Sequence, residues 1–165
     1  FDPRDAVKLA QHIADGKDLV GGTYVTKSET PQITARLFDG QSVKFKADAK
    51  LVKIKYLSGG FMMASRKVIE GVASRMKRCN SKESMSFYPL FMPFMKRVPK
   101  GVFHSEYEYV TEDYSFSDRA TEAGFDVWLD PSIRLIHAGE RYFVLEDIFE
   151  KSTRDAMPEI EVKKP

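Results

Sequence analysis

The chain has few of the features that identify a protein class at once. Its single cysteine, Cys79, excludes an internal disulfide and a zinc site built from several cysteines. No apolar run approaches the roughly 20 residues of a membrane-spanning helix, and no signal peptide is visible. The 26 basic and 24 acidic residues nearly balance, whereas nucleic-acid-binding domains usually carry a strong basic excess. We therefore expect no nucleic-acid partner, no transmembrane segment and a reducing, cytoplasmic setting.

The residues that are present fit one ordered globular domain. The chain has 165 residues, of which 42% are hydrophobic, and it contains 12 Phe and 7 Tyr. A disordered chain would be poorer in aromatic residues and more one-sided in charge. This length suffices for one domain with its own core. We expect a single domain over residues 1–155 and a polar C-terminal tail over 156–165 that frays.

Helices and strands alternate along the chain. Apolar spacing and capping residues predict helices at 2–16, after Ser65, at 110–124 and at 143–153. In the second of these helices, Val68, Ile69 and Val72 should face inward. Short apolar or alternating runs predict strands at 17–26, 33–39, 43–46, 52–56, 58–64, 126–130 and 132–139, with a turn at Pro131 between the last two. This order favours an α/β layered domain with a mixed sheet flanked by helices.

Two neighbouring strands, 43–46 and 52–56, alternate lysines with apolar residues. The polar segment ADAK between them predicts either a hairpin or two short successive strands. The lysine side chains either form a solvated face that blocks edge-to-edge pairing or contact an anionic partner.

Residues 86–101, SFYPLFMPFMKRVPKG, are strongly apolar but contain three prolines, which exclude a helix and a central strand. One interpretation is a loop packed over the core. The other is an exposed apolar surface, either a wall of a binding site or a contact with a membrane surface. Peripheral membrane contact therefore stays among the expected interactions.

One acidic residue, Asp113, shares a helix face with apolar residues. The next residues on its stripe, at steps of three, four and three, are Phe116, Ala120 and Ala123. This stripe should face the core, so the carboxylate is expected at the rim of the core in the first helical turn, where backbone N–H groups favour an anion. A carboxylate held there is suited to act as a general base. The alternative is a first-turn acid that only stabilises its helix.

The other acids of this helix and two of the histidines are expected to have different roles. Glu112 lies about 100° around the helix from Asp113 and therefore points elsewhere. Asp118 and Glu122 are expected to be solvated, and His12 and His104 to be structural or exposed.

His137 and two adjacent glycines are further candidates. His137 ends an apolar strand, on the same side as Ile133 and Leu135. A histidine at a strand end that faces a cleft binds a divalent metal or a phosphate, whereas the alternative is a hydrogen-bonded core histidine. Gly59 and Gly60 leave a stretch of backbone without side chains, which suits close approach by a ligand or a β-bulge.

Three segments, taken together, resemble the second half of a GT-A-type glycosyltransferase, an enzyme that uses a nucleotide-sugar donor. SGGFMMASRKVIEGV is similar to the family's glycine-containing strand and following helix beside the donor sugar and acceptor. TEDYSFSDRATEAGFDVWLDPSIRLIHAG is similar to its Glu-Asp helix, strand and terminal histidine-containing strand. FDPRDAVKLAQHI is similar to the helix that follows the family's Asp-x-Asp metal site. The likeness spans roughly residues 1–143.

The resemblance implies roles for the candidate residues on the acceptor side. Asp113 would match the carboxylate that takes the proton from the acceptor hydroxyl in inverting members, and Glu112 would help to position the acceptor. Gly59 and Gly60 would line the junction of donor sugar and acceptor. The acceptor itself would be a carbohydrate, a glycan or a glycoprotein.

The resemblance also implies a metal-assisted donor site. His137 would match the third protein ligand to the Mn²⁺ or Mg²⁺ that bridges the diphosphate of the nucleotide-sugar donor. Arg141 and Tyr142 would fall in a mobile loop that closes over the diphosphate. This interpretation requires Asp113 and His137 to open into one shared cavity.

The chain departs from the family pattern at its start. The family's nucleotide-binding strands and Asp-x-Asp motif should precede Phe1, and the chain opens without an initiator Met. We expect a longer parent enzyme, of which this chain lacks part of the N-terminal nucleotide-binding half. The alternative is a non-catalytic carbohydrate- or protein-binding module derived from such an enzyme.

Overall fold

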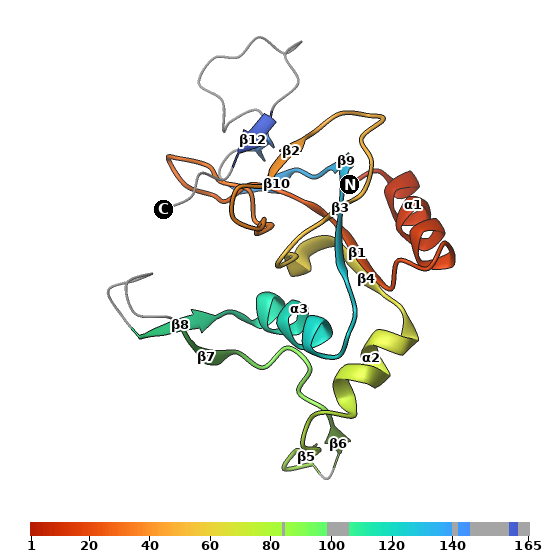
Figure 1. Cartoon of the computed structure of the whole chain (residues 1–165), viewed down its shortest axis with the longest axis vertical. Coiled ribbons are helices and arrows are strands. Elements are labelled where there is room, and N and C mark those ends of the chain that lie inside the picture. The colour runs from red at the N-terminus through yellow and green to blue at the C-terminus, as the bar shows by residue number, and fades with distance from the viewer. Residues whose placement is uncertain (84, 99–105, 140–141, 146–158, 162–165) are drawn as a thin grey trace.

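The computed structural model describes residues 1–83, 85–98, 106–139, 142–145 and 159–161 (Figure 1). The described helices are α1 (Pro3–Ala14), α2 (Arg66–Ala73) and α3 (Glu112–Glu122), with one 3-10 turn, η1 (Gly59–Phe61). The described strands are β1 (Leu19–Thr23), β2 (Ser42–Lys44), β3 (Val52–Lys53), β4 (Met62–Ala64), β5 (Cys79–Asn80), β6 (Ser86–Phe87), β7 (Phe94–Arg97), β8 (Tyr107–Val110), β9 (Val127–Arg134), β10 (His137–Ala138), β11 (Tyr142–Phe143) and β12 (Glu159–Glu161).

A four-stranded mixed sheet forms the centre of the molecule, in the order β3-β9-β1-β4. β1 runs parallel to β9, with Leu19 opposite Val127, and antiparallel to β4, with Leu19 opposite Ala64. β3 pairs with the other edge of β9 in antiparallel orientation. Figure 1 shows α1 on one side of this sheet and α2 with α3 on the other. The prediction of an α/β domain with a mixed sheet flanked by helices is confirmed.

Both faces of β1 are covered. Leu19 belongs to the larger apolar core, which α2 and α3 complete through Val68 and Phe116. Val20 faces the opposite way and packs in a second core with Leu9 of α1. Because successive residues of a strand point to opposite faces, a strand between two cores must be buried along its length. All five residues of β1 are buried, as this position requires.

The capping residues act as the sequence predicts. Asp2 caps α1 by accepting a hydrogen bond from the Arg4 N–H, and Ser65 caps α2 by accepting one from the Val68 N–H. Gly124 follows α3 with a φ of 93°, a conformation that favours glycine.

The apolar stripes are mostly confirmed. Phe116 and Ala120 of α3 are fully buried, and so are Val68 and Val72 of α2. The prediction for Ile69 is wrong, because this residue is exposed: it lies about 100° around the helix from Val68 and outside the stripe that packs on the core. None of the helices in the described part of the chain combines the length and the apolar character that membrane crossing requires.

The strand pairing decides between the two alternatives for the lysine-rich strands and corrects the prediction for residues 33–39. Strands 43–46 and 52–56 do not form a hairpin, because β2 pairs with β12 and β3 pairs with β9. They are two successive strands, the other alternative. The predicted strand at 33–39 is reduced to two isolated bridges, Val25 with Ile33 and Arg36 with Tyr56.

Pro131 lies within a strand rather than in a turn, so that prediction is wrong. In the pairing of β9 with β1, Gly21 is opposite Leu129 but Thr23 is opposite Arg134. The register shift leaves Pro131 in a bulge, where its missing N–H costs no ladder hydrogen bond.

The C-terminal region also differs from expectation where it is described. Residues 159–161, expected in a fraying tail, form β12 and pair with β2. The helix predicted at 143–153 does not include Phe143, which lies in β11, and residues 146–153 lie outside the described part of the chain.

The close approach of β1 to the turn before β4 gives a first testable prediction. A Cβ atom added at Gly21 would lie 2.5 Å from the Phe61 carbonyl oxygen and 2.8 Å from Leu57 Cδ2. Because a backbone oxygen cannot yield without moving the turn, Gly21→Ala should lower the free energy of unfolding by about 1–3 kcal/mol in urea denaturation. Ala10→Ser, at an exposed position of α1, should change it by less than about 0.5 kcal/mol. An unchanged stability of Gly21→Ala would contradict this packing.

Candidate functional site

The site is built around a hydrogen bond between two segments that are distant in sequence. The Gly59 N–H donates to Asp113 Oδ2 over 3.0 Å, across 54 residues of chain. A Cβ atom added at Gly59 would lie only 3.2 Å from Asp113 Cβ. The structure therefore brings together the acidic residue and the glycine pair that the sequence singles out separately.

Three donors fix the orientation of the Asp113 carboxylate. Besides the Gly59 N–H on Oδ2, the Thr111 hydroxyl donates to Oδ1 over 2.9 Å and the Tyr114 N–H donates to Oδ1 over 2.8 Å. Asp113 is partly exposed, so the carboxylate is held in place yet accessible. Glu112, one residue earlier, is exposed and its side chain forms no hydrogen bond with this group, which agrees with its predicted divergence.

The second glycine of the turn packs against an aromatic ring. A Cβ atom added at Gly60 would lie 2.4 Å from Tyr24 Cε1, so only glycine allows the turn and the ring to approach this closely. Ser58, which precedes the pair, is buried, and its Oγ lies 2.9 Å from Thr34 Oγ1. Thr34 Oγ1 also lies 3.0 Å from the Tyr24 carbonyl oxygen, so the same hydroxyl contacts the turn and the chain that follows β1.

His137 lies beside Tyr24. The two rings are 4.9 Å apart between centroids in an edge-on arrangement. His137 Nδ1 lies 2.8 Å from the Val25 carbonyl oxygen. Because a carbonyl oxygen only accepts, Nδ1 carries a proton, and in the neutral imidazole Nε2 then carries the free lone pair. No described residue hydrogen-bonds Nε2, so this atom is available as a ligand or an acceptor.

The sheet explains why these groups meet. β1 and β9 are parallel, so Tyr24 and Val25, after the end of β1, lie at the same edge of the sheet as His137, after the end of β9. β4 is antiparallel to β1, so the Gly59–Phe61 turn before it also lies at this edge. In open α/β sheets, ligands bind at the carboxyl ends of parallel strands.

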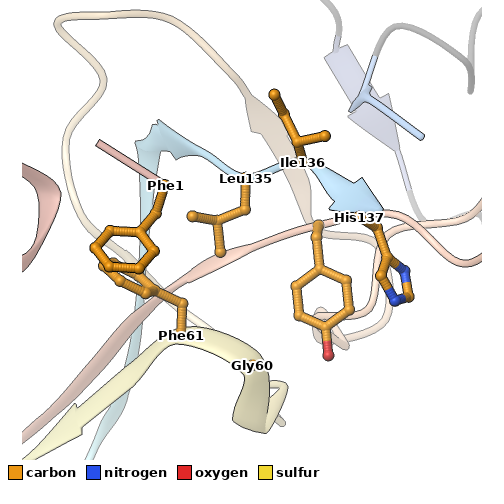
Figure 2. Close-up of a pocket in the computed structure, with 7 residues that line it drawn as sticks. Phe1, Gly60, Phe61, Leu135, Ile136 and His137 are labelled. Carbon is orange, nitrogen blue, oxygen red and sulfur yellow. The ribbon is translucent and has the colours of Figure 1, made fainter. Parts of the chain in front are cut away.

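A pocket of about 240 Å³ opens at this edge. Figure 2 shows Phe1 and Phe61 at one end of it and His137 at the other, with Gly60 below. It is lined by Phe1, Tyr24, Gly60, Phe61, Leu135, Ile136 and His137. Asp113 is not among these residues and adjoins the pocket only through Gly59, the neighbour of Gly60. The expected cavity shared by Asp113 and His137 is not found in this pocket: His137 lines it, whereas Asp113 lies outside it and hydrogen-bonds Gly59.

Two tyrosines, Tyr56 and Tyr114, pack next to the site. Their spacing in the sequence did not identify them as site residues. The Tyr114 hydroxyl donates to the Thr34 carbonyl oxygen, and its ring stacks on Tyr56 with centroids 5.1 Å apart. Burial raises the pKa of Tyr114. Burial, and then the charge of Asp118, raises the pKa of Tyr56. Like Tyr24 and Thr34, these residues acquire a role only through contacts between distant segments.

Asp118 is buried, so the prediction that it is solvated is wrong. Its Oδ1 accepts from the Tyr56 hydroxyl over 3.0 Å and from Lys96 Nζ over 2.6 Å. The partners come from remote segments, which explains why the helical pattern alone placed this acid in water. Glu122 is exposed, as expected.

The remaining candidates lie away from this edge or outside the described residues. His12 is structural, as predicted, with Nε2 2.9 Å from the buried Asp130 Oδ2. Arg141 and His104 lie outside the described part of the chain. Tyr142 is described only as backbone, in β11 opposite Ala138. Among the described residues, no group of three or more His, Cys, Asp or Glu side chains is arranged to hold a metal ion.

Comparison with known proteins identified no relative of this chain. No family model, no curated protein and no solved structure matches the chain.

The contrast between the two glycines gives a second prediction. Gly60→Ala should displace the Tyr24 ring and with it the environment of His137, because the added methyl group would overlap the ring. Gly59→Ala, whose added Cβ makes a milder 3.2 Å contact with Asp113, should leave that ring in place. Aromatic and imidazole NMR shifts measure both effects. Equal shifts of the His137 imidazole in the two variants would contradict the assigned packing.

The raised pKa values of Tyr56 and Tyr114 give a third prediction. Burial favours the neutral phenols, so their pKa is higher in the folded than in the unfolded state. Their contribution to stability is therefore fully present below the ordinary pKa of about 10 and is lost as the pH rises through the higher folded-state values. Ultraviolet titration of tyrosinate should show a late component that disappears in the double variant Tyr56→Phe/Tyr114→Phe and persists in Tyr109→Phe. Titration of all seven tyrosines together near the ordinary value in folded protein would refute this assignment.

Proposed function

We propose that this chain forms the acceptor-side part of a metal-dependent glycosyltransferase with a GT-A-like fold. The enzyme would transfer a sugar from a nucleotide-sugar donor to a hydroxyl of a carbohydrate, glycan or glycoprotein. The observation that carries the proposal is the 3.0 Å hydrogen bond between the Gly59 N–H and Asp113. The resemblance assigns the carboxylate and the glycine pair to adjoining parts of one reaction site, and this contact is what that assignment needs.

Asp113 would act as the general base. Its Oδ1 accepts two hydrogen bonds, whereas Oδ2 accepts one, from Gly59. A carboxylate oxygen has two lone pairs, so Oδ2 keeps one for a hydroxyl proton. Because three donors already orient the group, an acceptor hydroxyl placed over the Gly59–Gly60 turn meets a base that needs no rearrangement. Glu112, exposed at the start of the same helix, would contact the acceptor further out.

His137 would supply one protein ligand to the divalent cation. Its Nδ1–H donates to the Val25 carbonyl oxygen, so Nε2 is the nitrogen that carries the lone pair in the neutral imidazole. This is the tautomer that a metal-binding histidine with a backbone hydrogen-bond partner adopts. A bound Mn²⁺ or Mg²⁺ would stabilise the negative charge of a departing diphosphate. Within the described residues His137 is the ligand we assign, and Arg141 and Tyr142 stay predicted contacts of the diphosphate.

A second candidate is a carbohydrate-binding module without catalysis. The pocket itself favours it, because Phe1, Phe61 and Tyr24 line it with aromatic surface. Aromatic rings combine a large apolar face with a defined geometry, which suits the faces of sugar rings. This candidate needs the pocket but not the Asp113 carboxylate.

The two candidates predict different outcomes for one substitution, which is the fourth prediction. In the natural protein, including any residues that precede Phe1, Asp113→Asn should reduce glycosyl transfer by about 10²–10⁴-fold while donor binding persists. Asp39→Asn, an exposed acid outside the site, is the matched control and should retain activity. Transfer should also require a divalent cation and fall on addition of EDTA.

The stereochemistry of the product tests the role of the base separately. A base on the acceptor predicts inversion at the anomeric carbon. Full activity of Asp113→Asn, or a product with retained configuration, would exclude Asp113 as that base. Glycan binding with no transfer to any acceptor in a broad donor panel would favour the binding module.

A further inference from the structure

Exposed large apolar side chains concentrate in one stretch of the chain. Among the described residues, thirteen such side chains are exposed, and eight of them lie between residues 85 and 109. They are Met85, Phe87, Tyr88, Phe91, Met92, Met95, Tyr107 and Tyr109. Single exposed apolar residues need no explanation, whereas a contiguous exposed apolar patch marks an interaction surface.

The hairpin β7–β8 shows how this surface is built. Met95 is opposite Tyr109, and Arg97 is opposite Tyr107, so these four side chains share the outward face. All four are exposed, and Tyr109 keeps 62% of its accessible surface. The hairpin thus presents two tyrosines, one methionine and one arginine to solvent.

The inward face of the same hairpin is anchored to the domain. Lys96 pairs with the buried Asp118 of α3, and Glu108 pairs with Arg36 over 2.8 Å. The Arg119 guanidinium lies over the Phe94 ring. These contacts attach the hairpin to the domain and so fix the orientation of its apolar outward face.

Positive charge accompanies the apolar side chains. Seven basic and three acidic residues lie between positions 75 and 110, which leaves 19 basic and 21 acidic residues in the rest of the chain. Lys77, Arg78 and Lys82, around the hairpin β5–β6, are exposed and form no ion pair with a described residue, and the same holds for Arg97. Figure 1 places β5–β6 and β7–β8 in the half of the molecule away from β2 and β12.

We propose that the hairpins β5–β6 and β7–β8 form a docking surface for an anionic lipid bilayer. Tyrosine, phenylalanine and methionine side chains insert into the headgroup region, while neighbouring lysines and arginines bind the anionic headgroups. Charge complementarity selects this occupant. A symmetric contact with a second copy would bring two basic segments together, and like charges oppose such pairing. The inference does not depend on sugar transfer.

Vesicle flotation tests the proposal on the whole chain. The chain should bind vesicles of phosphatidylcholine with phosphatidylserine and not vesicles of phosphatidylcholine alone. Binding should weaken when ionic strength rises from about 0.1 M to about 1 M, since the screening length falls from about 10 Å to about 3 Å. Arg78→Glu/Lys82→Glu should reduce binding by about tenfold or more. Met95→Ser/Tyr109→Ser should reduce it by a similar factor, at both ionic strengths.

Matched controls lie outside the two hairpins. Lys27→Glu/Lys50→Glu changes the net charge equally, and Val7→Ser removes an exposed apolar side chain from α1. Both should retain binding. If Lys27→Glu/Lys50→Glu lost vesicle binding to the same degree as Arg78→Glu/Lys82→Glu, net charge alone would explain the loss. The proposed docking surface would then be wrong. Equal binding to neutral vesicles, no binding to either, or a dimer in light scattering that only the hairpin variants dissociate, would also overturn it.

Discussion

The hydrogen bond from the Gly59 N–H to the Asp113 carboxylate is the constraint on which the site depends. It is charge-assisted, a class that contributes roughly 1.5–3 kcal/mol. The absence of a side chain at Gly59 favours it, since a Cβ atom there would make a tight contact of 3.2 Å with Asp113 Cβ. The same turn places Gly60 against Tyr24, whose ring meets His137 edge-on. The Gly59 N–H thus fixes the position of Asp113 relative to the turn. Because Gly60 of the same turn lines the pocket, the turn also fixes where the pocket lies relative to Asp113.

The strand order and directions of the sheet bring the other groups of the site close to this contact. Because β1 and β9 are parallel, the chain leaves both strands at one edge, and the antiparallel β4 receives the Gly59–Phe61 turn at that edge. The Val25 carbonyl oxygen therefore meets His137, and the hydrogen bond between them sets the imidazole tautomer. β1 must be buried on both faces to occupy this central position, which its Leu, Val and Gly residues allow. The topology, rather than any single motif, determines which side chains are neighbours.

Local rules predicted the parts of the structure that local interactions decide. The caps at Asp2 and Ser65 and the buried stripe of Phe116 and Ala120 follow from spacing within one helix, and the structure has them. The predictions that were wrong concern features that contacts between distant segments determine. Asp118 is buried because Tyr56 and Lys96 reach it from outside its helix, and Pro131 stays in β9 because it lies in the bulge of that strand opposite β1. Tyr24 and Thr34 carry no pattern of their own, so the sequence offered no signal for them. The glycine pair and Asp113 were identified separately, but their contact required the fold.

α3 connects the candidate site with the exposed hairpins. Asp113 lies in its first turn, and Asp118 and Arg119 follow about 8–9 Å further along the axis, at a rise of 1.5 Å per residue. Asp118 binds Lys96 of β7, while the Arg119 guanidinium donates to the carbonyl oxygens of Leu90 and Met92. This ion pair is half-buried, with the Lys96 side chain 40% exposed, and it adds little net stability because desolvation of Asp118 opposes the attraction. It does specify one orientation: Asp118 Oδ2 has no hydrogen-bond partner among the described residues, so the carboxylate depends on Oδ1 for its contacts. A rigid helix held at both ends gives the hairpin surface a defined orientation relative to Asp113, and docking of that surface would orient the Gly59–Gly60 turn as well.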